Sequence, residues 1–183
     1  MLASASPQRR ALLEQVGIAF SVRPSGVAER DFGDPAEVAG ENACRKAVAV
    51  REPGALVLGA DTVVGVDGDV LGKPADSAQA RTHLQRLAGR EHRVCGGIAL
   101  AREGNVIASA VEITRVRFRV LDDAWIDWYL ATGEWRERAG GYAIQGAGAA
   151  LVSGIAGDYA NVVGLPLARL LELAPELLPP GRI

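Results

Sequence analysis

Apolar and polar residues alternate along this chain with two periods, one typical of helices and one typical of strands. Residues 7–16 place apolar side chains at helical spacing, and Ser6 before Pro7 has the order of an N-cap and a first helical residue. The same signals predict four further helices, at 35–52 after Asp34, from Asp76 to near Gly89, from Asp122 or Asp123 through Tyr129, and at 161–178.

Apolar runs of strand length predict the sheet. Residues 55–64 form an apolar run that first meets a polar residue at Asp61, which is typical of a strand buried on both faces. Asp67-Gly68 predicts a tight hairpin. Further strands are expected at 91–102, 105–120, 141–146 and 149–155. Because helices interleave with strands while some strands follow one another directly, the pattern predicts an α/β fold with a mixed sheet rather than a pure βαβ wind.

The composition narrows the class of protein. At 183 residues the chain is expected to form a single domain, residues 1–183, with a core of its own. A net charge of −2 lacks the basic excess of a nucleic-acid-binding surface, and no apolar run is long enough to span a bilayer. No charged segment followed by an apolar core opens the sequence, so we expect a cytoplasmic protein with no nucleic-acid or membrane partner.

The stretch SASPQRR at residues 4–10 has two interpretations. Arg9 and Arg10 put positive charge in the first turn of a helix, where the helix dipole disfavours it. A bound phosphate would explain this choice, because it accepts hydrogen bonds from helix N–H groups, from hydroxyls such as that of Ser6 and from guanidinium groups. The alternative is a capped surface helix whose arginines are solvated.

Acidic residues and lysines further along are candidates for chemistry at a phosphate. Asp61 is expected at the end of a buried strand, where α/β sheets bind ligands and a carboxylate can hold a divalent cation or orient a water. An Asx turn at the strand end is the alternative. Glu29, with Glu41 or Lys46, either joins it in space or lies on the surface. Lys73 in GDVLGKP either reaches a phosphate or is a solvated loop lysine, since this segment lacks the spacing and the Ser/Thr of a Walker A motif.

Gln145 follows a short apolar run and precedes a glycine, so its side chain is expected at a cleft or turn. An amide both donates and accepts hydrogen bonds, which suits the edge of a nucleobase, and a structural glutamine is the alternative. The neighbouring GAGAAL lacks the last glycine and the following helix of a dinucleotide-binding fingerprint.

Taken together, these segments resemble the Maf family of nucleotide pyrophosphatases over essentially the whole chain. LASASPQRRALL resembles its opening signature, LGADTVV its catalytic strand and LGKP its lysine loop, and TRVRF, ERAGGYAIQG and NVVGLPL match further on in the same order. The resemblance implies an elongated mixed sheet with flanking helices in two lobes, as in the inosine triphosphate pyrophosphatases. It also implies a homodimeric enzyme that hydrolyses a nucleoside triphosphate to the monophosphate and pyrophosphate with Mg²⁺ or Mn²⁺.

The resemblance also implies roles for particular residues of this sequence. Asp61 becomes the catalytic carboxylate and a metal ligand, and Glu29 a second, metal-linked acidic residue. Phosphate binding falls on four residues, Ser6, Arg9, Lys46 and Lys73. Recognition of the base falls on three residues, Gln8, Thr62 and Gln145.

Both matches to the family and departures from it bear on the substrate. Thr62 and Gln145 fit the branch that acts on dTTP and UTP, extending to modified pyrimidine nucleotides. Gln8 fits neither branch, because an arginine there would fit the dTTP/UTP branch and a tryptophan the 7-methyl-GTP branch. Gly96 and Trp135 stand where a threonine and a proline are usual.

Two other interpretations compete with a dTTP/UTP pyrophosphatase. One is a 7-methyl-GTP pyrophosphatase, and the other is a non-catalytic nucleotide-binding regulator of cell division. The pair of Asp61 and Glu29 favours chemistry over regulation, because a protein that only binds a nucleotide needs the cations for phosphate but not the acidic pair.

Overall fold

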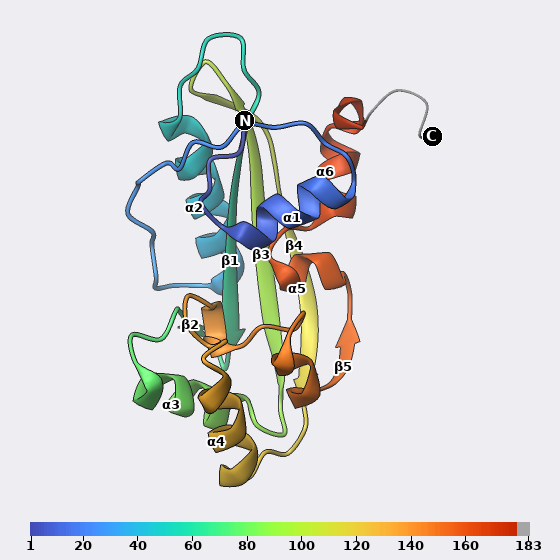
Figure 1. The fold of residues 1–183 in the computed structure, drawn as a ribbon. Helices are drawn as coiled ribbons and strands as arrows, with labels where there is room; N and C mark the ends of the chain where they lie inside the picture. Colours follow the sequence, from blue (N-terminus) through green and yellow to red (C-terminus); the bar gives the residue numbers. More distant parts are fainter. Residues whose placement is uncertain (179–183) are drawn as a thin grey trace.

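The computed structural model describes residues 1–178, in which five strands form one elongated sheet in the order β2-β1-β3-β4-β5 (Figure 1). The strands are β1 (Val57–Val66), β2 (Asp69–Leu71), β3 (Glu91–Arg102), β4 (Asn105–Phe118) and β5 (Val152–Ala156). All neighbouring strands in this order pair antiparallel. The mixed sheet expected from the sequence is therefore wrong for the five strands, and within residues 1–178 parallel pairing occurs only in the isolated bridges of Leu2 with Val22 and Leu58, outside these strands.

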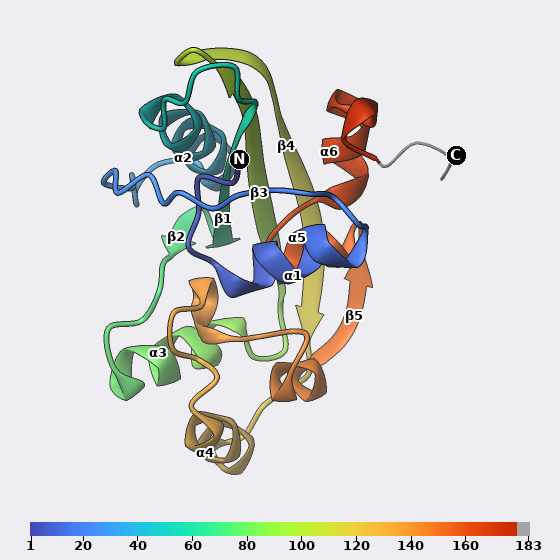
Figure 2. The ribbon, with the colours of Figure 1, turned by 45° about the horizontal axis from the view of Figure 1, so that its top comes forward.

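Within residues 1–178, six α-helices flank this sheet (Figures 1 and 2). They are α1 (Pro7–Gln15), α2 (Pro35–Ala49), α3 (Ser77–Leu87), α4 (Asp123–Thr132), α5 (Tyr159–Val163) and α6 (Leu167–Leu173). The expected caps are confirmed, since each of Ser6, Asp34, Asp76 and Asp122 accepts a hydrogen bond from a main-chain N–H of the first turn. The α/β class is therefore confirmed. None of the helices within residues 1–178 has the length and apolarity to cross a bilayer.

Two expected elements near the C-terminus are wrong. Residues 141–146 do not form a strand, because Gly140 and Gly141 both have positive φ and the short 3₁₀ turn Ala139–Gly141 takes the place of extended backbone. The apolar residues that follow, 142–144, are buried without pairing to the sheet. The helix predicted at 161–178 breaks into α5 and α6, because Gly164 has a φ of 142° and Pro166 lacks an N–H to continue the helix.

Helix α2 packs directly on β1 and β3 because both strands carry a glycine at the contact. A Cβ on Gly59 would lie 2.2 Å from the carbonyl oxygen of Ala43, and one on Gly97 would lie 2.1 Å from that of Ala39. Both distances are far below van der Waals contact, so only glycine allows the helix backbone this close. The close approach brings the buried face of α2, which carries Asn42 and Lys46, against the middle of β1.

Two large apolar clusters lie at opposite ends of the long strands. One cluster packs Leu2 and α1 against Leu58 and α6. The other packs α3 and α4 against the distal half of β1, beginning at Val64. Thr62 lies on β1 between the two clusters, on the face where Ala60 belongs to one and Val64 to the other. The two lobes that the resemblance implies correspond to these clusters.

Candidate active site

A cleft of about 710 Å³ opens across the middle of β1. Its wall includes all the residues to which the resemblance assigns a role: Ser6, Gln8, Arg9, Glu29, Lys46, Asp61, Thr62, Lys73 and Gln145. Arg10 and Glu41, the other candidates, are exposed and do not line it. The residues in the wall come from α1, α2, β1 and three separate loops, so the fold brings distant segments of the sequence together at one site.

Asp61 lies in the middle of β1, opposite Gly97 of β3, and not at the end of a strand as expected. The rule that ligands bind at carboxyl ends of strands applies to parallel sheets, and this sheet is antiparallel. Strand alternation instead points Asp61 toward α2 and its neighbour Thr62 toward α1 and α5. The side chain of Asp61 is 9 % exposed, so only a small part of it is open to the cleft.

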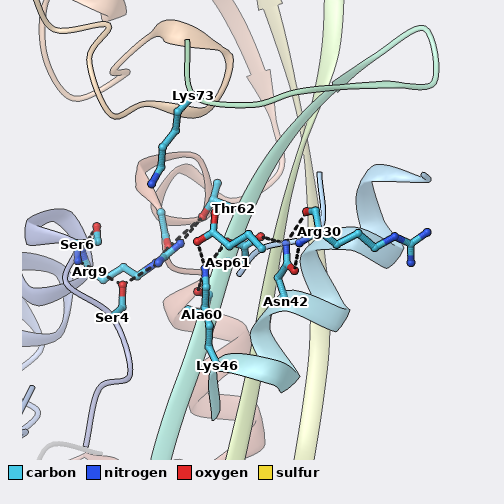
Figure 3. Close-up of polar contacts among 12 residues, drawn as sticks. Ser4, Ser6, Arg9, Arg30, Asn42, Lys46, Ala60, Asp61, Thr62 and Lys73 are labelled. Atoms are coloured by element: carbon cyan, nitrogen blue, oxygen red, sulfur yellow. Dashed lines mark hydrogen bonds and ion pairs between the residues drawn. The ribbon is translucent and has the colours of Figure 1, made fainter. Parts of the chain in front are cut away.

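The ammonium group of Lys46 lies between two carboxylates. Its Nζ is 2.6 Å from Asp61 Oδ1 and 2.6 Å from Glu29 Oε1, and it also donates to the carbonyl oxygen of Ala60 at 3.4 Å (Figure 3). Glu41, considered as an alternative on the same helix, is exposed and pairs with the side chain of Arg30 instead. Lys46 and Glu29 therefore join Asp61, and Glu41 does not.

The charge state of Glu29 depends on this contact. Burial acts to raise the pKa of Glu29, but the hydrogen bond and charge of Lys46, together with the charges of Lys73 and Arg9, outweigh it and leave the pKa below its ordinary value. The site thus keeps an ionised Glu29 beside Asp61 at neutral pH.

Arg9 is built into the wall of the cleft. Its Nε donates to the carbonyl oxygen of Gly164 at 2.9 Å, and its two terminal nitrogens donate to Ser4 Oγ at 2.9 Å and to Thr62 Oγ1 at 3.1 Å (Figure 3). Burial lowers the pKa of Arg9, and the charges of Asp61 and Glu29 oppose that shift. Three of the five N–H donors of the guanidinium are engaged, so two remain for an anion in the cleft.

The start of α1 is both a helix cap and a side of the cleft. Ser6 Oγ accepts from the N–H of Arg9 at 3.5 Å and donates to Gln8 Oε1 at 3.1 Å. Gln8 Oε1 also accepts from Arg138 at 3.2 Å, which links α1 to the loop on the opposite side of the cleft. The two interpretations of SASPQRR therefore do not exclude each other, since the capped helix end lines the cleft.

Lys73 and Gln145 are the more exposed of the predicted residues. Lys73 extends into the cleft from the loop after β2 (Figure 3), and Glu137 lies 3.6 Å from its Nζ; the side chain of Lys73 is half-exposed and that of Glu137 is exposed. Gln145 is exposed in a turn, and its amide has no hydrogen bond to any residue within 1–178. Both side chains are free to adjust to a ligand.

Comparison with known proteins assigns the chain to a family. The family model described as Maf-like protein matches residues 1–177. This chain belongs to the Maf-like protein family. Among curated relatives, the dTTP/UTP pyrophosphatase of Symbiobacterium thermophilum is 53% identical over 180 residues, covering 96% of the Maf-like chain and 92% of the relative. That of Pyrococcus furiosus is 46% identical over 184 residues, covering 97% and 96%.

One solved structure is also similar to the Maf-like chain. A HAM1 protein from Coxiella burnetii aligns with a TM-score of 0.44 and 20% identity, over 64% of this chain and 71% of that one.

The donor set of the Maf-like site fits a divalent cation that binds together with a substrate. Within residues 1–178 no group of three or more His, Cys, Asp or Glu side chains forms a complete protein site for a metal. Asp61 and Glu29 nevertheless converge on one cation, the Lys46 ammonium. Mg²⁺ is commonly held by one or two carboxylates, waters and substrate phosphates, which is the set that this cleft and a triphosphate would provide.

Four residues of the site are missed by reasoning from sequence. Asn42 donates to Asp61 Oδ2 at 2.9 Å, Ser4 and Gly164 hold Arg9, and Arg138 holds Gln8. Asn42 carries one local signal, because it precedes Lys46 by one helical turn and must share its face. A main-chain oxygen such as that of Gly164 has no signal in the sequence.

Proposed function

We propose that this Maf-like chain is a nucleoside triphosphate pyrophosphatase that acts on dTTP and UTP, extending to modified pyrimidine nucleotides. It hydrolyses the triphosphate to the nucleoside monophosphate and pyrophosphate. The observation that carries the proposal is the Lys46 ammonium held at 2.6 Å from both Asp61 and Glu29 in the wall of the cleft, with Arg9 beside it. The names of the relatives from Symbiobacterium thermophilum and Pyrococcus furiosus support the substrate class.

In the proposed reaction, Asp61 orients a water and accepts its proton as the water attacks the α-phosphorus. A bond forms from the water oxygen to this phosphorus, and the bond to the oxygen bridging the α- and β-phosphates breaks, so pyrophosphate leaves. Phosphoryl transfer depends mainly on positioning and on neutralising charge, and the cations Arg9, Lys46 and Lys73 supply that neutralisation along the triphosphate.

A divalent cation, Mg²⁺ or Mn²⁺, is part of the proposal. Asp61 and Glu29 would hold it with the phosphates, and when bound it would polarise the phosphoryl oxygens and neutralise the leaving pyrophosphate. Ser6, by turning its O–H from Gln8 Oε1 to a phosphate oxygen, and the N–H groups at the start of α1 would donate to phosphate at the same side of the cleft.

The base is proposed to bind near Gln145, Gln8 and Thr62. Gln145 is exposed to the cleft with both donor and acceptor groups free of partners within residues 1–178, as base recognition requires. Gln8 accepts two hydrogen bonds at its carbonyl oxygen, which leaves its N–H groups for a ligand. Thr62 already donates to Gly164 and accepts from Arg9, so it contributes chiefly by shaping the wall.

The test is pyrophosphate release from a panel of dTTP, UTP, 7-methyl-GTP and the other common triphosphates, with Mg²⁺, with Mn²⁺ and with EDTA. In ¹⁸O-labelled water, attack at the α-phosphorus puts the label in the monophosphate and none in pyrophosphate. Asp61→Asn should lower kcat by about 10³-fold, within the range for losing a general base. Asp67→Asn, in the β1–β2 turn, is the matched control and should retain the parent rate.

Several outcomes would refute the proposal. A folded Asp61→Asn variant with a near-parent rate would remove Asp61 from its role, and label in pyrophosphate would move the attack to another phosphorus. Silence of the parent protein across the whole panel would favour a nucleotide-binding regulator.

A homodimer in the cytoplasm completes the proposal. Large apolar side chains are exposed on β4 at Val106, Ile107 and Ile113, which is consistent with a further contact surface. A light-scattering mass near 19.2 kDa, the mass of one chain, would exclude the dimer.

A further inference from the structure

The segment that carries Glu29 has few contacts of its own to hold it in place. We call residues 24–33 the Glu29 loop; it lines the cleft between Arg23, whose N–H donates to Leu2, and Asp34, which caps α2. Within residues 1–178 the main chain of this loop makes no hydrogen bond to the main chain of any other segment. Gly26 and Gly33, with positive φ, give it further conformational freedom.

Asn42 supplies the main-chain partners that the loop otherwise lacks. Asn42 Oδ1 accepts from the N–H of Arg30 at 2.8 Å, and Asn42 Nδ2 donates to the carbonyl oxygen of the same residue at 2.9 Å. The side-chain amide thus pairs with Arg30 as a neighbouring strand would. Because Arg30 follows Glu29 directly, this contact fixes the backbone next to the Glu29 carboxylate.

The same amide also holds the proposed catalytic carboxylate. The second hydrogen of Asn42 Nδ2 goes to Asp61 Oδ2 at 2.9 Å, while Lys46 takes Asp61 Oδ1 at 2.6 Å (Figure 3). Each oxygen of Asp61 therefore has its own donor, and the plane of the carboxylate is defined. Turning the amide over would place its oxygen against Asp61 and its NH₂ against the Arg30 N–H, so only one orientation satisfies all three contacts.

Burial makes this arrangement rigid. Asn42 is 2 % exposed and lies one helical turn before Lys46 on α2, which Gly59 and Gly97 allow to pack close to the sheet. The Glu29 side chain, which is 44 % exposed, also contacts the buried Lys46, and Arg30 pairs with the exposed Glu41. Asn42 is the buried side chain that links the main chain of the Glu29 loop to Asp61.

We propose that Asn42 is a positioning residue that docks the Glu29 loop onto α2 and orients Asp61, so that the carboxylates of Glu29 and Asp61 both face the Lys46 ammonium. This role rests on the proposed function for its effect on catalysis, but the docking of the loop does not depend on it. Asn42 acts through Asp61 and Arg30, the two residues to which its amide is hydrogen-bonded.

The experiment combines turnover with amide hydrogen exchange by NMR on the full chain without nucleotide. Arg30 has the one main-chain N–H of the Glu29 loop with a hydrogen bond inside residues 1–178, so its exchange reports the Asn42 contact. Asn42→Leu, of similar volume, should speed Arg30 exchange at least about tenfold and lower kcat by about 10- to 100-fold. KM should change by less than about threefold, because the loss falls on the transition state.

A second variant and a control separate the two contacts of the amide. Asn42→Asp keeps an acceptor for the Arg30 N–H but faces Asp61 with a carboxylate, so it should keep slow exchange at Arg30 while kcat falls as far as in Asn42→Leu. Glu41→Ala removes the exposed ion pair of Arg30 on the same helix and should leave both kcat and Arg30 exchange at parent values.

The outcomes are decisive in each arm. Unchanged exchange at Arg30 in a folded Asn42→Leu variant overturns the docking role, whether or not the parent hydrolyses any nucleotide. Fast exchange with a parent kcat overturns the positioning role. A parent protein that releases no pyrophosphate refutes the proposed function alone, since the exchange comparison still decides the docking.

Discussion

Lys46→Met tests whether the ammonium group of Lys46 stabilises the two carboxylates, Asp61 and Glu29, in the wall of the cleft. The side chain of Lys46 is 7 % exposed and that of Asp61 is 9 % exposed, so the variant leaves a buried carboxylate without its cation. Removing one partner of a buried ion pair typically costs 3–5 kcal/mol. We expect about 3 kcal/mol at pH 7, the lower end, because Asn42 still donates to Asp61 Oδ2.

The difference in free energy of unfolding between the parent and Lys46→Met should shrink as the pH falls. In the parent, the lowered pKa of Glu29 adds stability that is present above its unfolded value and is lost as the pH falls through the folded value. Without Lys46, burial acts on Glu29 with less opposition and its pKa rises, so protonation at lower pH relieves the variant. The raised pKa of Glu29 in the variant brings the two free energies of unfolding closer between pH 7 and pH 4.5, and the loss in the parent adds to this below pH 4.5.

Urea unfolding followed by tryptophan fluorescence, at pH 7 and at pH 4.5 without nucleotide or metal, measures both quantities. Lys73→Met is the matched control: its lysine lies in the same cleft but is half-exposed, so stability should change by less than about 0.5 kcal/mol while pyrophosphate release still falls. A Lys46→Met protein as stable as the parent at pH 7, or a deficit that persists at pH 4.5, would contradict the argument.

Two further predictions concern the packed core. Burial lowers the pKa of His92 to about 4, so as the pH falls the unfolded chain binds a proton at this residue before the folded chain does. The free energy of unfolding of the parent should therefore fall by about 2 kcal/mol between pH 7 and pH 5, a loss that His92→Phe should not show. Equal pH dependence of the urea midpoints of the two proteins would refute this. A Cβ on Gly96 would lie 1.8 Å from Oδ1 of the fully buried Asn161, so Gly96→Ala should lower the free energy of unfolding by about 2–4 kcal/mol. Gly154→Ala, which has open space around it, should be neutral in the same measurement, and a neutral Gly96→Ala would show that Asn161 moves aside freely.

Elements whose signals are local could be predicted from the sequence, and elements set by tertiary contacts could not. The caps at Ser6 and Asp34 and the hairpin at Asp67 are formed by neighbours in the chain, and the structure has them where the sequence predicts them. The apolar run at 141–146 fitted a strand equally well, but its residues pack into the core of the α3–α4 lobe, with the Tyr129 hydroxyl accepting from the N–H of Ala143 at 2.9 Å. That partner is 14 residues away, beyond the reach of a local pattern.

The candidate site shows the same division. Residues with unusual local context, such as Arg9 at a helix N-terminus and Asp61 in an apolar run, stand out in the sequence itself. Asn42 does not stand out, because a single asparagine in a helix is usually read as a solvated surface residue. Its importance arises only from its contacts with Arg30 and Asp61. Buried polar groups are informative mainly through their partners, and those partners are fixed by tertiary packing.

The ADT stretch of β1 explains why one short motif can serve a cleft that opens in the middle of a sheet. Successive strand residues face opposite sides, so Asp61 meets α2 with Lys46 while Thr62 meets Arg9 and Gly164. Asp61 reaches α2 because Gly59 and Gly97, which have no side chain, let the helix pack close to the sheet. On the opposite face, Thr62 has room because it lies between the two apolar clusters. A one-residue shift in the pairing of β1 would exchange these faces and put the carboxylate against the arginine, which separates it from Glu29, the other acidic ligand proposed for the cation.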